Sequence, residues 1–197
     1  MSQRRKLIAG AIVIAAAACV IGILAARQTT PPPPATPPAT LRAVSAEHAR
    51  IVLHVKDATR IEPPFVRTDD PTGAAGAVVA VPPKAGTRPG ALLVPFTIPA
   101  KGKYSIWLRV YWATDHEGAC SDSVSVALDG ASPRMVQDAT YETWHWLPLR
   151  AREGIDLDAG AHSLLFTNRE DGIKFDQVFI TPWDDDESAR YVPQGIE

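Results

Sequence analysis

Residues 103–112 have the sequence KYSIWLRVYW, the most regular alternation of side-chain types in the chain. Successive side chains of a β-strand point to opposite faces of the sheet, so this pattern predicts one strand with two distinct faces. The core face is expected to carry Tyr104, Ile106, Leu108, Val110 and Trp112. The outer face is expected to carry Ser105, Trp107, Arg109 and Tyr111. The outer face is either covered by a second packed layer, or exposed as a platform that stacks on a sugar or grips a partner protein.

Other stretches with the same period-two pattern lie on both sides of this strand. They are residues 49–55, 76–82, 91–99, 122–130, 143–150, 160–168 and 173–181. Turn-forming pairs such as Pro-Gly at 89–90 and Asp-Gly at 129–130 separate them. No stretch after residue 41 shows a helical period. The pattern therefore predicts an all-β domain, an antiparallel β-sandwich or jelly roll.

The most charged part of this region is residues 168–181, NREDGIKFDQVFIT. The sequence Arg-Glu-Asp-Gly at 169–172 is typical of a tight turn and predicts a hairpin between the last two strands. Its acids are then turn residues and not catalysts. Asp176 differs, because it is expected in mid-strand on the same face as Val178. A carboxylate there needs a partner: Arg169, backbone N–H groups or a calcium ion.

Composition and motifs argue against several classes of function. A formal net charge of -2 provides no basic surface for nucleic acid. The chain has no G-x-S-x-G nucleophile elbow and no glycine-rich phosphate loop. His116 and Cys120 form a lone pair without the second pair that a zinc site needs. Cys19 and Cys120 are not expected to form a disulfide. We therefore expect a protein that is not an enzyme.

The N-terminal region predicts a membrane anchor. Residues 7–26 carry no charge and would span about 30 Å as a helix, the thickness of a bilayer core. Arg4, Arg5 and Lys6 precede them, so the N-terminus is expected inside and the rest outside. The expected location is the bacterial inner membrane, crossed once, with the C-terminal domain in the periplasm or outside. Signal-peptide cleavage after residue 25 or 26 and lipidation at Cys19 are the alternatives.

These features divide the chain into three parts. Residues 1–28 form a cytoplasmic stub and transmembrane helix, and residues 43–197 form the β-sandwich domain. Between them, residues 29–42 are rich in proline and are expected to act as a polyproline II spacer.

Several motifs occur in an order that resembles a known family. They are Glu47, AAGAVVAVP (74–82), GKYSIWLRV (102–110), DSVSVALDG (122–130), WHW (144–146), AGAHSLLF (159–166) and REDGIKFD (169–176). Over residues 45–197 this order is similar to the galactose-binding-like β-sandwiches, and among them to the carbohydrate-binding modules of bacterial glycosidases.

The resemblance implies two kinds of site. A structural calcium would be held by Glu47 and Asp176, although the first acid of the family's usual pair is replaced here by Ser45. Sugar contacts would come from loop aromatics and from an asparagine before the last strand. The matching positions are Tyr111, Trp112, Trp144 and Asn168. Trp112 and Trp144 could equally be core residues.

Two functions remain for a membrane-anchored sandwich without catalysis. The first is an accessory subunit that stabilises a multi-subunit membrane complex. The Ala- and Gly-rich composition of residues 10–26 supports it, because small residues let helices approach closely in lipid. The alternative is a carbohydrate-binding module displayed at the cell surface or in the periplasm. We favour the first from the sequence.

Overall fold

The computed structural model describes residues 50–114, 121–150 and 153–183. Within these ranges the strands form two sheets. The seven-stranded sheet contains β1 (Ile51–His54), β3 (Val66–Asp69), β4 (Ala77–Val81), β6 (Gly102–Trp112), β9 (Trp144–Pro148), β10 (Ile155–Leu157) and β12 (Ile173–Pro182). The five-stranded sheet contains β2 (Arg60–Ile61), β5 (Ala91–Ile98), β7 (Ser123–Leu128), β8 (Arg134–Gln137) and β11 (Gly160–Thr167). A short 3₁₀ turn, η2 (Val55–Asp57), follows β1.

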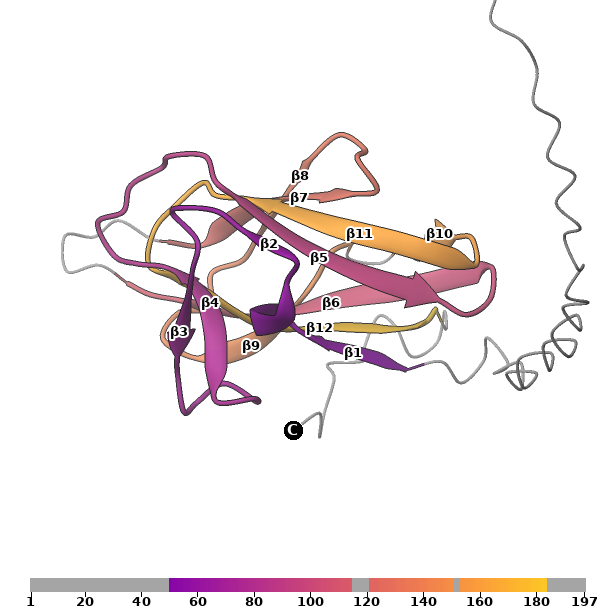
Figure 1. Ribbon diagram of the computed structural model, residues 1–197, viewed down its shortest axis with the longest axis horizontal. Helices are drawn as coiled ribbons and strands as arrows, with labels where there is room; N and C mark the ends of the chain where they lie inside the picture. The colour runs from indigo at the N-terminus through magenta and orange to yellow at the C-terminus, as the bar shows by residue number, and fades with distance from the viewer. Residues whose placement is uncertain (1–49, 115–120, 151–152, 184–197) are drawn as a thin grey trace, which may run out of the picture. The chain divides into compact units, whose positions relative to one another are not determined.

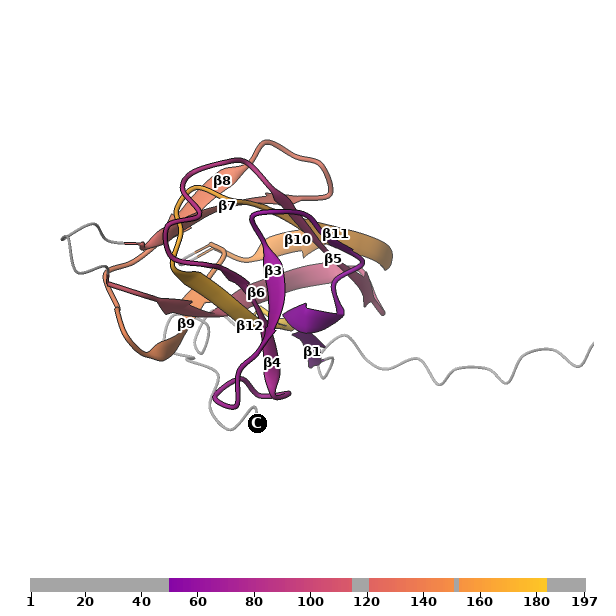
Figure 2. The same cartoon turned by 60° about the vertical axis from the view of Figure 1, so that its left-hand side comes forward.

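The two sheets lie face to face as a β-sandwich, which confirms the predicted fold class. In both views β5 and β11 lie over β6 and β12 (Figure 1, Figure 2). The strand order is β10-β6-β12-β4-β3 in one sheet, with β1 also paired to β12 and β9 to β6, and β2-β5-β11-β7-β8 in the other. The paired strands are antiparallel.

Each of the eight stretches with period-two alternation contains a strand of the structure. Four further strands, β2, β3, β8 and β10, have two to four residues each and are too short to show a period. No helix in the described ranges is long and apolar enough to span a bilayer. The predicted anchor and the proline-rich spacer both lie outside these ranges.

Strand β6 divides its side chains between the two faces as its sequence predicts. Its core-face residues are buried between the sheets: Tyr104, Ile106, Leu108, Val110 and Trp112. Opposite them, Leu92 of β5 and Phe166 of β11 are also fully buried. Burial of this apolar surface is the main stabilising contribution in a sandwich of this kind.

The predicted hairpin at residues 169–172 is wrong. Strand β11 pairs with β5 and β7, whereas β12 pairs with β4, β6 and β1, so the segment crosses from one sheet to the other. Gly172 has a φ of 74°. Its N–H donates to Val81, and its carbonyl oxygen accepts from Ala113. The predicted turn residues do form a bend, but its backbone groups bond to the end of β4 and to the residue after β6 and do not form a β11–β12 ladder.

The predicted orientation of Asp176 is also wrong, because β12 contains a β-bulge. The pairing register with β6 shifts between Phe175 and Gln177. Phe175 and Val178 both lie in the core although three positions separate them. A bulge inserts one extra residue and so changes which side chains share a face. Asp176 is the residue within this irregularity, and its carboxylate meets Arg109 of the outer face.

His162 of β11 joins two turns at one end of the five-stranded sheet. Its Nδ1 lies 2.6 Å from a carboxylate oxygen of Asp129, and its Nε2 lies 2.8 Å from the carbonyl oxygen of Asp158. The ring also stacks on Phe96, with centroids 5.4 Å apart. Both partners of the ring nitrogens are acceptors, so both contacts are hydrogen bonds only when the imidazole is charged.

We expect this link to make stability depend on pH. Burial acts to lower the pKa of His162, but the hydrogen bonds to Asp129 and Asp158 outweigh it and raise the pKa above its ordinary value of 6.5. A raised pKa means that the stabilisation is complete below that ordinary value and is lost as pH rises through the folded-state pKa. Melting temperatures of the native chain and of His162→Gln, compared from about pH 5.5 to about pH 9, should therefore converge at the alkaline end. A difference that does not change with pH would contradict this role.

Candidate functional site

The outer face of the seven-stranded sheet carries a row of large side chains across three strands. Trp144 of β9 pairs with Tyr111 of β6, and Tyr111 pairs with Lys174 of β12. All three side chains are partly exposed. Arg109, two residues before Tyr111 on the same strand, belongs to the same face. We call Arg109, Tyr111, Trp144 and Lys174 the aromatic–cation group.

The members of the aromatic–cation group touch one another. The rings of Tyr111 and Trp144 lie with centroids 5.6 Å apart and tilted by 60°. The guanidinium carbon of Arg109 lies 5.0 Å from the centroid of the Trp144 ring. The ammonium of Lys174 lies 4.9 Å from the centroid of the Tyr111 ring. These distances are in the range of cation–π contacts, so each aromatic ring has a cation over one face.

Hydrogen bonds fix the two rings. The indole N–H of Trp144 donates to Thr72 Oγ1 over 2.8 Å. The hydroxyl of Tyr111 donates to Glu142 over 2.5 Å, and the hydrogen bond together with burial raises the pKa of Tyr111. The second carboxylate oxygen of Glu142 accepts from the N–H and the hydroxyl of Thr114. Anchored rings lose little conformational freedom when a ligand packs against them, which favours binding.

Both cations of the group have a carboxylate partner. Lys174 Nζ lies 2.8 Å from a carboxylate oxygen of Asp70. Burial acts to raise the pKa of Asp70, but hydrogen bonds from Lys174 and Thr72 outweigh it, so the pKa is lowered. Arg109 forms an ion pair with Asp176, which is completely buried. The charges of this surface are therefore balanced within the protein.

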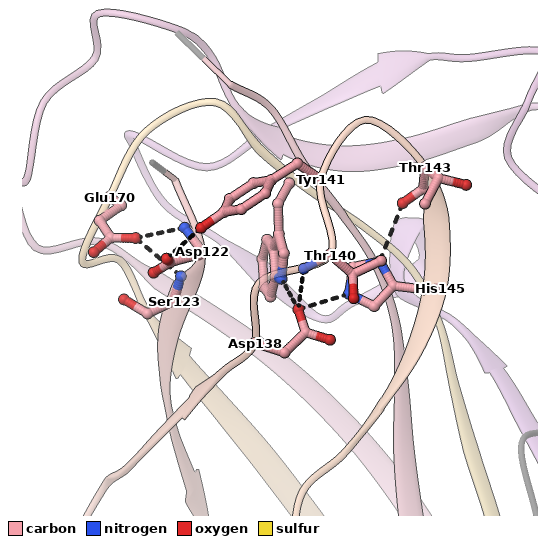
Figure 3. Close-up of polar contacts among 9 residues, drawn as sticks. Asp122, Ser123, Asp138, Thr140, Tyr141, Thr143, His145 and Glu170 are labelled. Carbon is pink, nitrogen blue, oxygen red and sulfur yellow. Dashed lines mark hydrogen bonds and ion pairs between the residues drawn. The ribbon is translucent and has the colours of Figure 1, made fainter. Parts of the chain in front are cut away.

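A second polar cluster gathers residues from the starts of β7 and β9, from the segment between β8 and β9, and from the segment between β11 and β12 (Figure 3). One carboxylate oxygen of Asp138 accepts from the N–H of Thr140 and lies 3.1 Å from Nε2 of His145. In the other half of the cluster, Glu170 accepts from the N–H groups of Asp122 and Ser123, 2.8 and 2.9 Å away. These contacts satisfy backbone N–H groups where β7 begins, so Glu170 stabilises this part of the fold.

The aromatic–cation group contains three of the six ligand-contact residues predicted from the sequence, namely Arg109, Tyr111 and Trp144. Trp112 is fully buried, and its indole N–H donates to Asp138. Asn168 is buried in the loop before β12, where its NH₂ group donates to two backbone carbonyl oxygens, those of Gly86 and Arg88. Trp107 lies on the outer face, but only 8% of it is exposed. The structure does not bring these three residues into the group.

The surroundings of Asp176 do not fit a calcium ion. Its two carboxylate oxygens accept from the N–H of Ala74 at 3.2 and 3.1 Å, and one of them also accepts from Arg109. A guanidinium and an amide donor already occupy the positions that a cation would take. In the described ranges no three His, Cys, Asp or Glu side chains are grouped to hold a metal. Glu47 lies outside those ranges, so calcium binding stays a prediction.

Sequence reasoning missed Lys174, Asp70 and Thr72. Lys174 faces Tyr111 only because β12 pairs with β6 in one particular register. Asp70 and Thr72 belong to the loop between β3 and β4, which is far from both strands in the sequence. One signal was present: the apolar positions of β12 change parity between Phe175 and Val178, which indicates a bulge and places Lys174 on the outer face.

Comparisons with known proteins identify the fold. No protein-family model matches the sequence, and no curated protein sequence matches it. Among solved structures, a family 35 carbohydrate binding module from Clostridium thermocellum superposes with a TM-score of 0.52 and 16% identity, covering 66% of this chain and 98% of that one. A module (CBM6cm-2) from Cellvibrio mixtus lichenase 5A, in complex with cellotriose, gives 0.50 and 16% identity, covering 68% and 98%.

A third match shows how such a domain can occur within a longer protein. The GH26-CBM35 β-(1,4)-mannanase of Podospora anserina superposes with a TM-score of 0.51 and 14% identity. The superposition covers 68% of this chain but 28% of the mannanase. At these identities the likeness establishes the fold. The domain described here thus has the β-sandwich of carbohydrate-binding modules, in agreement with the resemblance inferred from the sequence motifs.

Proposed function

We propose that this protein is a non-catalytic carbohydrate-binding protein whose β-sandwich holds a glycan chain on the aromatic–cation group. The observation that carries the proposal is the pair of partly exposed rings, Tyr111 and Trp144, side by side with centroids 5.6 Å apart. A pyranose ring has an apolar C–H face that packs on an aromatic ring and hydroxyl groups that bond to polar side chains around it. Aromatic walls with a few placed polar groups are typical of ligand sites.

The polar side chains needed by this proposal are already at the rim of the rings. Thr72 lies beside Trp144, while Glu142 lies beside Tyr111, each at hydrogen-bond distance. The hydroxyl of Thr72 accepts from Trp144 and donates to Asp70, so its remaining lone pair can accept a hydrogen bond from a sugar hydroxyl. The solved structures that share the fold support the choice of ligand class, since one of them is a module in complex with cellotriose.

The comparisons favour this function over the accessory-subunit hypothesis, which the fold neighbours do not support. The location proposed for the protein is unchanged from the sequence: an exported domain tethered to the bacterial inner membrane by residues 7–26. In this arrangement the proline-rich spacer holds the sandwich away from the bilayer, where it can reach a polysaccharide.

We expect Tyr111→Ala and Trp144→Ala each to weaken glycan binding by about tenfold or more, because each removes an aromatic contact of the kind that dominates binding energy. The measurement is calorimetric titration of the full-length protein with cellotriose and with β-(1,4)-mannan oligosaccharides. Met135→Ala is a matched control, since Met135 is an exposed apolar residue on β8 of the other sheet. Full-strength binding by both aromatic variants would reject this face as the site.

A further inference from the structure

Each cation of the aromatic–cation group forms an ion pair with a carboxylate of the protein. Lys174 and Asp70 form an ion pair of 2.8 Å, and Asp70 also accepts from the N–H and hydroxyl of Thr72. Asp70 is nearly buried, with 10% of its side chain exposed, whereas 36% of the Lys174 side chain is exposed. The carboxylate is therefore less exposed than the lysine side chain with which it pairs.

Arg109 is neutralised in the same way from beneath the surface. Its guanidinium bonds to Asp176, which has no exposed surface, and 21% of the Arg109 side chain remains exposed. Glu142 adds a third carboxylate at the edge of the rings, bonded to the hydroxyl of Tyr111. A ligand that approaches the two rings thus meets two cations that already have carboxylate partners, and a further carboxylate beside them.

An anionic ligand gains little from such a surface. Recognition of a carboxylate by a protein normally relies on a guanidinium or ammonium whose hydrogen bonds are free to turn to the ligand. Here a ligand carboxylate would have to compete with Asp70 or Asp176 for the same donors. It would also lie near like charges, and like charges that face each other across an interface weaken binding.

We propose that Asp70 and Asp176 make the aromatic–cation group selective for uncharged glycans and that Asp70 is the specificity-determining residue. This inference rests on the proposed function, because it concerns the ligand class of the same site. Asp176 is buried and bonded to the backbone of Ala74, so its main role is to support the sheet. Asp70 can be changed with less disturbance, because asparagine retains an oxygen for the two hydrogen bonds from Thr72.

The experiment uses two trisaccharides that differ in one group per sugar. Cellotriose carries CH₂OH at C6, and the trimer of β-(1,4)-linked glucuronic acid carries a carboxylate there. The full-length protein is titrated with each. The native chain is expected to bind cellotriose and to bind the glucuronate trimer at least about fivefold more weakly. Asp70→Asn is expected to raise the affinity for the glucuronate trimer relative to that for cellotriose about fivefold.

Asp69→Asn provides the matched control. Asp69 is the neighbouring residue, exposed at the end of β3, and its replacement changes the net charge of the protein by the same amount. Under the proposal Asp69→Asn leaves the affinity for the glucuronate trimer unchanged. The gain in Asp70→Asn should also shrink as salt is added, since it comes from the charge of a partly exposed lysine.

The outcomes separate this inference from the proposed function. If the native chain binds both trisaccharides equally, or if Asp70→Asn gains no affinity for the glucuronate trimer, the selectivity is overturned while glycan binding stands. An equal gain in Asp69→Asn would also overturn it, because the effect would then be one of net charge. If no variant binds any glycan, both the inference and the proposed function fail.

Discussion

Arg109→Met is expected to destabilise the folded protein by about 3–5 kcal/mol, the range found when one partner of a buried ion pair is removed. Asp176 has no exposed surface, and its carboxylate is bonded to Arg109 and to the N–H of Ala74. Without the guanidinium, a buried carboxylate keeps one amide donor and no opposite charge. Urea unfolding of the full-length chain, followed by circular dichroism, measures the loss.

A double variant shows the origin of this loss. Asp176→Asn in the Arg109→Met background removes the unpaired charge, so the double variant should be more stable than Arg109→Met. The two changes are therefore expected to be strongly non-additive. Arg67→Met is the control, because Arg67 is exposed on β3. An Arg109→Met protein that unfolds at the same urea concentration as the native chain would show that Asp176 is stabilised by other groups.

Trp112→Ala is expected to lower the free energy of unfolding by about 3–5 kcal/mol, the usual range for removing a large buried aromatic residue. Trp112 has no exposed surface, packs edge-on against Phe175 with centroids 6.3 Å apart, and donates its indole N–H to Asp138. Truncation leaves a cavity between the sheets and removes that donor. The same urea unfolding experiment measures the loss.

A comparison between two tryptophans tests the assignment of the site. Trp112→Phe keeps most of the core volume and should cost about 1–2 kcal/mol through the lost hydrogen bond, with unchanged affinity for cellotriose. Trp144→Ala, on the outer face, should have the opposite profile of a modest stability loss and a large loss of affinity. If Trp112→Phe weakens binding as much as Trp144→Ala does, the ligand lies near the loops at the end of β6 instead.

The local pattern of the sequence predicts the sandwich well, because burial on one face imposes period two on a strand. The two faces of β6 follow directly from residues 103–112. The same alternation also places Arg109 and Tyr111 together on the outer face of this strand. Trp144 is predicted as a ligand contact, and its position opposite Tyr111 depends on the pairing of β9 with β6.

What the sequence does not predict depends on contacts between distant segments. The turn at 169–172 has the same chemistry in a hairpin as in a crossing between sheets, and only the partners of β11 and β12 distinguish the two. The ion pair between Asp70 and Lys174 joins residues far apart in the chain, and no local signal links them. Of the partners predicted for Asp176, a backbone N–H group is confirmed, that of Ala74, whereas Arg169 donates to Ser123 and the ion pair is formed by the more distant Arg109.

The central position of β12 has a consequence for biosynthesis. Strand β12 connects β4 and β1 on one side to β6 on the other, yet it is the last described strand in the chain. The five-stranded sheet is complete in sequence once β11 has been made. The seven-stranded sheet remains in separate pieces until β12 is available, and contacts between distant segments form slowly. During synthesis the domain therefore emerges with the seven-stranded half of its core unassembled, and its native state is reached only after β12 has been made.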